Sequence, residues 1–380
     1  MKNKSLVVST GFAMFSMFFG SGNLVFPLTA GKLAEGHFAL ASLGFLLTGV
    51  LVPFLGVFAM FLYRGDVRSF FHSLGKGATF WFPLFALSIM GPFGVLARCI
   101  TVAHGTFCLL FSGVSLPVFS VGMCASIFLI TLNKGRIMST LGTYLTPILL
   151  LSLGAIVSLG LWHGSFPAVQ EMAQWSSFQT GFLQGYQTMD LLAAFFFSTF
   201  ILQHLEKRSG QNHNQSELIK IFVKAAVIGA GLLSFTYVAL VALGTIYGEA
   251  LNGVPPEQMF GAVAEIALGP YAAPILCVAV ILACYTTAIV LTSLFADFLK
   301  QEVLKDKIPN YAAIIVTLLI AFTVSTFEFA GIARFLGPVL EVIYPALITL
   351  TILNILHKVG GYQLYRWPIA ATLATKVLWF

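Results

Sequence analysis

The sequence predicts an all-α integral membrane protein of about eleven transmembrane helices, forming one transporter domain over residues 1–380. Three observations lead to this prediction. Of the 380 residues, 58% are hydrophobic and 9% are charged, whereas an ordinary soluble domain has roughly 25% charged residues. The mean hydropathy is +0.93. Long apolar runs also recur from end to end without a polar linker, and apolar segments in lipid must be helical to pair their backbone groups.

Eleven apolar segments are the candidate membrane spans. Most exceed the ~20 residues that cross about 30 Å of hydrocarbon. The first is too long for the apolar region of a signal peptide, which has ~7–15 residues, and the last is short. The predicted spans are 7–30, 38–63, 78–110, 115–132, 140–162, 181–203, 219–247, 268–299, 309–326, 334–356 and 365–380.

The basic residues are concentrated in alternate loops between these spans. If the N-terminus is cytoplasmic, 16 of the 20 Lys and Arg residues lie on the cytoplasmic side, and only Lys32 and Arg334 lie in outer loops. This is the asymmetry expected of short loops in a multi-pass membrane protein. The net charge of +6 therefore reflects topology and does not indicate a nucleic-acid partner.

The sequence lacks the motifs that several other classes of function require. The five cysteines have no metal-like spacing, and no nucleotide-binding Gly-Lys-Ser/Thr loop is present, so we expect no cofactor and no ATP-driven transport. A membrane enzyme would need clustered His, Asp or Glu residues near one interface. A channel would need a filter motif. Neither is found, so the sequence does not predict an enzyme or a channel.

The first span contains a polar, glycine-rich interruption. Gly20, Ser21, Gly22 and Asn23 lie in the middle of an otherwise apolar segment, and Pro27 follows them. Glycine costs about 1 kcal/mol against alanine in a helix, and Ser and Asn compete for backbone hydrogen bonds. Small residues also allow close helix packing, but Asn23 and Pro27 add nothing to it. We therefore predict an unwound stretch that faces protein or a polar cavity.

The sixth span repeats this pattern. The segment from Gly181 to Asp190 contains glycines and polar residues, including Tyr186 and Thr188, and precedes an apolar run. An aspartate within the membrane is costly and is a candidate for function. The alternative is that Asp190 lies near the outer surface. Paired interrupted helices at matching positions in two halves are typical of a transporter site.

The two interruptions are five spans apart. A five-helix unit ends on the membrane side opposite to its start, so a second unit must be inverted. Spans three and eight, at 78–110 and 268–299, are both unusually long, which supports this correspondence. The sequence therefore predicts inverted repeats at about 7–162 and 181–356, with an extra span at 365–380.

Span eight contains two adjacent hydroxyls, Thr286 and Thr287. Hydroxyls and carbonyls released by a broken helix can supply the several oxygens that bind a sodium ion. A threonine in a membrane helix more often bonds its own preceding carbonyl, so both interpretations stay open. Among the other charges within spans, the role of Arg98 stays open, and for Glu341 a structural ion pair is preferred.

At these motifs the sequence resembles the bacterial branched-chain amino acid:cation symporters, over nearly the whole chain. The resemblance is densest at 11–15 and 18–27, and it returns at 185–193 and around 282–292. It implies two inverted five-helix repeats in the bacterial inner membrane. The chain departs from the family at Leu28, where a second proline is common, and in having eleven spans rather than twelve.

The resemblance also implies site residues. The first broken stretch would bind the substrate carboxylate with backbone N–H groups at the positive end of a half-helix, and the second would help to orient the amine. Oxygens between spans one and eight would bind a sodium ion. The implied substrate-binding residues are Gly20, Ser21, Gly22, Asn23, Tyr186, Thr188 and Asp190, and the implied sodium ligands are Ser16, Phe19, Ala283, Thr286 and Thr287.

The resulting hypothesis is sodium-coupled uptake of Leu, Ile or Val by alternating access, in which the broken pair rocks against spans three, four, eight and nine. The expected partners are the amino acid, a sodium ion and the lipid bilayer; nothing in the sequence specifies an oligomeric state. The alternative within transport is a proton-coupled carrier or exchanger of another amino acid or amine, with Asp190 as the proton carrier.

Overall fold

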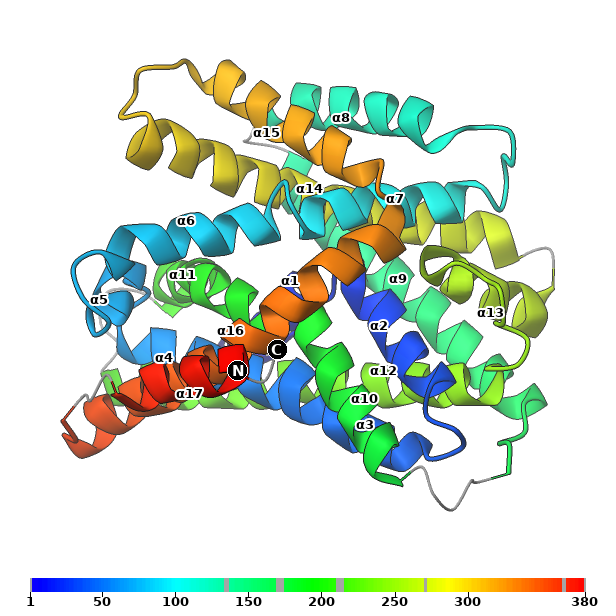
Figure 1. Ribbon diagram of the computed structural model, residues 1–380, viewed down its shortest axis with the longest axis horizontal. Helices are drawn as coiled ribbons and strands as arrows, with labels where there is room; N and C mark the ends of the chain where they lie inside the picture. Colours follow the sequence, from blue (N-terminus) through cyan, green and yellow to red (C-terminus); the bar gives the residue numbers. More distant parts are fainter. Residues whose placement is uncertain are drawn as a thin grey trace.

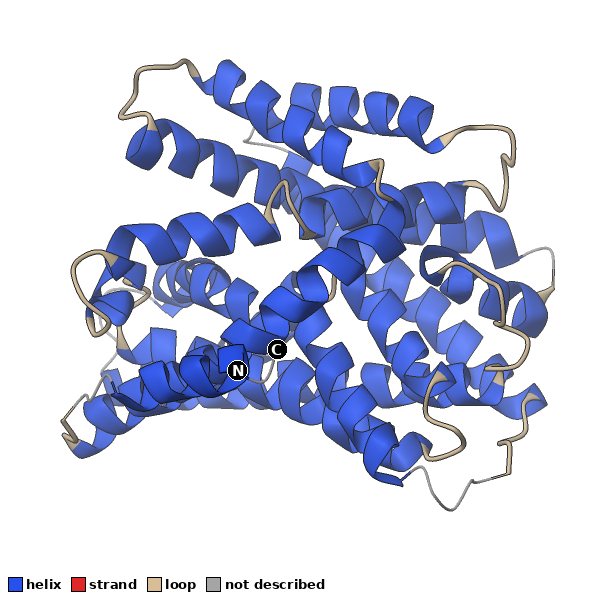
Figure 2. Cartoon of the chain, viewed as in Figure 1, coloured by secondary structure: helices blue, strands red, loops and turns tan. Residues whose placement is uncertain are grey.

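The computed structural model describes residues 2–132, 137–168, 174–209, 215–269, 272–363 and 367–378. Within these ranges the regular elements are all helices, as Figure 2 shows. A chain this apolar can pair its backbone groups within each helix and still face lipid, which is why helices are the expected solution. The predicted all-α class is confirmed.

The helices in the first half of the chain follow the predicted apolar segments. A π-helical turn at Leu47–Leu51 joins two helices into the single predicted span 38–63. In order, the helices are α1 (Lys2–Phe18), α2 (Gly22–Lys32), α3 (Phe38–Leu46), α4 (Val52–Leu62), α5 (Val67–His72), α6 (Ala78–Met90), α7 (Val95–Phe107), α8 (Leu116–Leu132) and α9 (Ile137–His163).

The second half follows the same plan, with the short helix α13 added in a connection that the hydropathy pattern did not predict. The helices are α10 (Gln174–Gln187), α11 (Asp190–Ser209), α12 (Gln215–Ile246), α13 (Met259–Leu268), α14 (Ala272–Phe298), α15 (Asn310–Ser325), α16 (Glu328–Gly360) and α17 (Trp367–Leu378).

By length and composition, the described residues contain five helical spans that could cross a membrane, with α6 and α7 counted as one, and up to seven if each of two bent helix pairs also counts as one span. The bent pairs are α1 with α2, at 73°, and α10 with α11, at 42°. These are the two interrupted spans that the sequence predicts, so both broken helices are confirmed. The total of eleven spans stays a prediction.

The last predicted span, 365–380, corresponds to α17, whose 12 described residues rise by about 18 Å. That is shorter than the roughly 30 Å hydrocarbon core of a bilayer. The helix packs against α16. Residues 364–366 and 379–380 lie outside the described ranges.

The span 78–110 was predicted as one helix, but the structure has an interruption in it. The turn Gly91–Gly94 separates α6 from α7. A Cβ on Gly94 would lie 2.1 Å from the carbonyl oxygen of Ile89, so only glycine fits there. The amide of Arg98 donates to the carbonyl of Gly94 at 2.9 Å, which starts α7 directly after the turn.

Helix packing repeats between the two halves. α1 and α2 pack on α12, and, in the same relation, α10 and α11 pack on α3 and α4. The contact of α14 with α9 is matched by that of α7 with α16. This reciprocity is what two equivalent five-span units produce. The repeat boundaries, 7–162 and 181–356, stay a prediction.

Four helices form a separate layer beside the broken pair. α7, α8, α14 and α15 each contact the other three. In Figure 1, α8 and α15 lie along one edge of the molecule, with α7 and α14 beneath them and α3 and α12 toward the opposite edge. These four are spans three, four, eight and nine.

Replacing Gly244 with alanine should destabilise the fold by about 1–3 kcal/mol, because overpacking a tight contact forces the backbone to shift. Its Cβ would lie 2.2 Å from the carbonyl oxygen of Leu28, where α12 meets α2. Gly231→Ala, on the same helix, meets nothing within 4 Å and should stabilise by roughly 0.5–1 kcal/mol. Thermal unfolding of the purified protein in detergent measures both. Equal effects would contradict the close approach of α2 to α12.

Candidate functional site

The first break lies between α1 and α2, where Phe19, Gly20 and Ser21 belong to neither helix. The amide of Phe19 still donates to the carbonyl of Phe15 at 2.9 Å. The amide of Gly20 instead donates to the side-chain Oδ1 of Asn23 at 3.3 Å. A side chain has thus replaced a backbone acceptor, which is how asparagine competes with helical structure.

The second break lies between α10 and α11. Met189 has a left-handed backbone there, with φ of 61°. This conformation is uncommon for a residue other than glycine, and strained residues of this kind cluster at functional sites. The hydroxyl of Thr188 accepts a hydrogen bond from the amide of Asp190 at 3.4 Å. Thr188 therefore helps to satisfy the first backbone N–H groups of α11.

One polar cluster joins the two breaks. Asn23 Nδ2 donates to Oδ2 of Asp190 at 2.7 Å and also to the hydroxyl of Tyr237 on α12. The Tyr237 hydroxyl donates to the same carboxylate oxygen at 3.2 Å. All three side chains are at most 3% exposed. Asp190 is therefore buried inside the protein, between the two breaks.

A cavity of about 30 Å³ lies between the breaks. Its polar side contains predicted site residues from both breaks and from α14. The rest of its lining is apolar and comes from α1, α6, α7 and α11, the second break and α14. The polar lining residues are Gly20, Asn23, Thr188, Asp190 and Thr287, and the apolar ones are Met17, Phe18, Met90, Val95, Met189, Ala193, Phe197 and Leu291.

The structure thus brings five of the twelve predicted site residues to one cavity, and the roles of all twelve stay a prediction. Two others point elsewhere. The Ser21 hydroxyl lies 3.4 Å from Sγ of Cys99, and the ring of Tyr186 packs against Tyr344 with centroids 4.6 Å apart. Sequence reasoning missed Tyr237. A tyrosine hydroxyl within the apolar span 219–247 is the signal that could have found it.

The predicted sodium ligands lie where α14 faces the first break. The hydroxyls of Thr286 and Thr287 donate to the carbonyl of Ala283 at 2.8 and 3.2 Å. A Cβ built on Gly20 would lie 3.8 Å from Oγ1 of Thr287. A hydroxyl that donates one hydrogen bond keeps its lone pairs as acceptors. The intrahelical bonds are therefore compatible with ion binding.

Arg98 of α7 reaches the C-terminal end of α10. Its guanidinium donates to the backbone carbonyl of Gln187 at 2.8 Å and to the side-chain Oε1 of Gln187 at 2.9 Å. It also lies over the rings of Phe26 and Phe329, 4.9 and 5.5 Å from their centroids. For Glu341, the preferred ion pair is absent among the described residues, whose ion pairs lie at Arg68–Glu302 and Lys300–Asp306.

Each break brings together one positive and one negative helix end. At the second break the protein supplies both opposite charges, since Asp190 begins α11 and Arg98 contacts the last residue of α10. At the first break, α1 has no basic residue in its last turn and α2 has no acidic residue in its first turn. The first break therefore offers two helix ends that no charge of their own helices neutralises.

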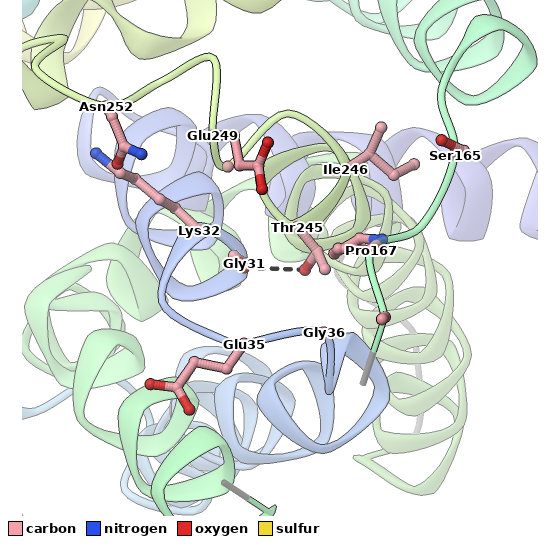
Figure 3. Close-up of a pocket in the computed structure, with 12 residues that line it drawn as sticks. Gly31, Lys32, Glu35, Gly36, Ser165, Pro167, Thr245, Ile246, Glu249 and Asn252 are labelled. Atoms are coloured by element: carbon pink, nitrogen blue, oxygen red, sulfur yellow. Dashed lines mark hydrogen bonds between the residues drawn. The ribbon is translucent and has the colours of Figure 1, made fainter. Parts of the chain in front are cut away.

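A larger cavity, of about 660 Å³, lies at the far ends of α2 and α12. Figure 3 shows Lys32 and Glu249 among its lining residues, and the hydroxyl of Thr245 donating to the carbonyl of Gly31 at 2.9 Å. None of the predicted site residues lines it. The candidate site is therefore the small cavity between the breaks.

Comparison with known proteins gives the family. The family described as branched-chain amino acid transport protein matches residues 2–379. The chain belongs to this family. The resemblance seen in the sequence is thereby confirmed, and so is the expectation of a multi-pass membrane transporter.

Relatives of this transport family cover most of the chain. The branched-chain amino acid permease BrnQ of Bacillus subtilis is 31% identical, over 95% of this chain and 84% of the relative. The branched-chain amino acid transport system 3 carrier protein of Pseudomonas aeruginosa is 31% identical, over 92% of this chain and 80% of the relative. Both relatives are named as transporters. The expectation of a transporter rather than an enzyme is therefore confirmed.

Two solved structures share the fold. The inward-facing conformation of Mhp1 has a TM-score of 0.60 at 15% identity, and covers 93% of this chain and 77% of its own. The Eremococcus coleocola manganese transporter has a TM-score of 0.57 at 16% identity, and covers 98% of this chain and 85% of its own. At these identities the likeness shows the fold alone.

Proposed function

We propose that this member of the branched-chain amino acid transport family is a sodium-coupled symporter that takes up Leu, Ile or Val by alternating access. It would lie in the bacterial inner membrane with its N-terminus in the cytoplasm. The observation that carries the proposal is the pair of helix ends at the first break, which no charge of α1 or α2 neutralises and which adjoins a cavity with an apolar side.

The start of α2 suits a carboxylate. The positive end of a helix attracts anions, and the amides of Asn23 and Leu24 at the start of α2 donate to the carbonyls of Gly20 and Ser21 only at 3.2 and 3.3 Å. Gly20 and Gly22 have no side chain to keep a ligand from the backbone. Across the cavity, the Asp190 carboxylate would attract the substrate amine through a charge-assisted hydrogen bond. The two breaks together therefore match an amino acid zwitterion.

The apolar side suits an aliphatic side chain. Phe18, Phe197 and Leu291 line the cavity together with three methionines. Burial of a Leu, Ile or Val side chain stabilises a complex by about 1.5–3 kcal/mol relative to leaving it in water. A charged or amide side chain would lose its hydration here without gaining a partner. The lining therefore favours branched-chain substrates over polar ones.

The end of α1 suits a cation. Hard cations bind oxygen ligands, and the negative end of a helix attracts cations. The carbonyls of Ser16 and Phe19 would be joined across the break by the Ala283 carbonyl and by the hydroxyls of Thr286 and Thr287. A sodium ion bound there would link α1 to α14, and so couple the broken pair to the layer of α7, α8, α14 and α15.

The test is uptake of labelled leucine by proteoliposomes that contain the purified protein, with and without an inward sodium gradient. Sodium-dependent uptake is expected. Uptake that follows a pH gradient and ignores sodium would contradict sodium coupling and favour Asp190 as a proton carrier. Absence of leucine uptake under either gradient would contradict the substrate class.

Replacing Thr286 and Thr287 together with valine should raise the sodium concentration for half-maximal uptake by about tenfold, since a loss of about 1.4 kcal/mol in binding corresponds to that factor. Two of five proposed oxygen ligands would be absent. The measurement is leucine uptake against external sodium. Thr323→Val is the matched control, because the Thr323 hydroxyl bonds the Leu319 carbonyl in the same way on the exposed side of α15. An unchanged sodium dependence in the double variant would place the ion elsewhere.

A further inference from the structure

Arg98 is a buried charge that the proposed transport mechanism does not use. Its side chain is 1% exposed, and a charge within a membrane helix is costly unless it is compensated. Among the described residues no acidic side chain forms an ion pair with it. It is compensated by the two oxygens of Gln187 and by two aromatic faces. A neutral side chain would cost less, so stability alone does not explain an arginine here.

The crossing of α7 with α14 relates Arg98 to the candidate ion site. α7, which carries Arg98 and Cys99, packs against α14, which carries Ala283 and Cys284. The residues that precede these cysteines are Arg98 and Ala283. Since α7 and α14 belong to the third span of their respective predicted repeats, Arg98 and Ala283 lie on corresponding spans. Ala283 supplies one of the proposed sodium ligands.

The helix ends correspond in the same way. Arg98 donates to the carbonyl of Gln187, the last residue of α10. The proposed sodium ion would bind carbonyls at the end of α1, facing Ala283 and its neighbours on α14. In both halves the negative end of the first half-helix therefore faces the third span of the other repeat.

We propose that Arg98 is a resident cation, which holds the end of α10 at the second break as the coupling sodium ion holds the end of α1 at the first. The inference rests on the proposed function for its comparison with sodium. Arg98 is then a positioning residue: by fixing Gln187 it fixes Asp190, three residues further along the chain, and hence the group that orients the substrate amine. The carrier needs a mobile cation at only one of its two breaks.

Chemical rescue tests the proposal. Arg98→Ala should lower leucine uptake by about a hundredfold, because hydrogen bonds from a charged group are lost at a buried site. Millimolar guanidinium chloride should restore uptake to at least a tenth of the wild-type rate, because the free ion fits the space that the side chain leaves. Arg98→Lys should keep part of the activity, and Arg98→Met, which fills the space without a charge, should be inactive and should not respond to guanidinium. Arg334→Ala, at an exposed arginine, is the control and should behave as wild type under both conditions.

A second readout does not require transport. Millimolar guanidinium should raise the melting temperature of purified Arg98→Ala, and should not raise that of the wild type or of Arg98→Met. If Arg98→Met transports leucine as the wild type does, or if guanidinium restores neither uptake nor melting temperature in Arg98→Ala, the proposal is overturned. If the wild type fails to transport leucine while guanidinium still stabilises Arg98→Ala, the role of Arg98 as a resident cation is supported and the proposed substrate is contradicted.

Discussion

Replacing Asp190 with asparagine should lower kcat/KM for leucine uptake by about a hundredfold. Asparagine keeps the shape of the side chain but removes the charge that would attract the substrate amine. It also places an amide where Asn23 and Tyr237 both donate to a carboxylate oxygen. Hydrogen bonds to charged groups contribute about 1.5–3 kcal/mol each, which corresponds to roughly 10- to 150-fold. Initial uptake rates over a range of leucine concentrations measure the change.

Two control variants test whether the loss of uptake is specific to the charge of Asp190. Tyr237→Phe removes one of two donors to the same carboxylate and keeps its charge, so it should cost about tenfold, less than Asp190→Asn. Asp66→Asn makes the same acid-to-amide change outside the membrane spans, at the start of α5. There the Ser69 hydroxyl is the main cause that lowers the pKa of Asp66, and asparagine caps a helix about as well as aspartate. Asp66→Asn should therefore transport normally. If Asp190→Asn transports leucine normally, the proposed role of Asp190 in binding the substrate is contradicted.

Replacing Gly20 with leucine should abolish uptake, to less than about a hundredth of the wild-type rate. Gly20 lines the cavity between the breaks, whose volume is about 30 Å³. A leucine side chain would fill the part of the cavity next to Gly20 and push Asn23 or Thr287 aside, each 3.8 Å from the Cβ position. Overpacking of this kind also costs about 1–3 kcal/mol in stability. Leucine uptake, together with gel filtration to confirm a folded protein, is the measurement.

A graded series separates blockage from misfolding. Gly20→Ala places only a Cβ at ordinary contact distance, so it should keep a folded protein and lose about tenfold or less. Gly122→Leu makes the same large change on the exposed face of α8, where a Cβ meets nothing within 4 Å. It should transport as the wild type does. Full activity in Gly20→Leu would show that the substrate does not pass between the breaks.

The two breaks could be predicted because their residues conflict with a helix locally. Glycine, asparagine and a buried aspartate each disfavour an apolar helix, and the conflict is visible without tertiary structure. Thr287 could be placed near them by resemblance alone. The residues that the sequence grouped correctly are therefore those whose chemistry is unusual for a membrane span.

Contacts between distant spans could not be predicted in this way. Tyr237 is one hydroxyl in an apolar helix, and only the packing of α12 against the broken pair brings it to Asp190. Arg98 was recognised as costly, but both of its acceptors belong to Gln187 in a distant span, and no local pattern in the sequence pairs the two residues. Tyr186 lies beside Asp190 in the motif, yet the helical rotation of α10 turns its ring toward Tyr344 instead.

The methionines of the cavity wall have a consequence for selectivity. Met17, Met90 and Met189 all line the space between the breaks. Methionine is unbranched and polarisable, and it adapts its shape to irregular neighbours at little cost. At the proposed site these three side chains would adapt to leucine, isoleucine or valine, whereas the rings of Phe18 and Phe197 and the β-branched Val95 in the same lining are stiffer. If the substrate binds at this cavity as proposed, replacing these methionines with β-branched residues should narrow the range of aliphatic amino acids that the carrier accepts.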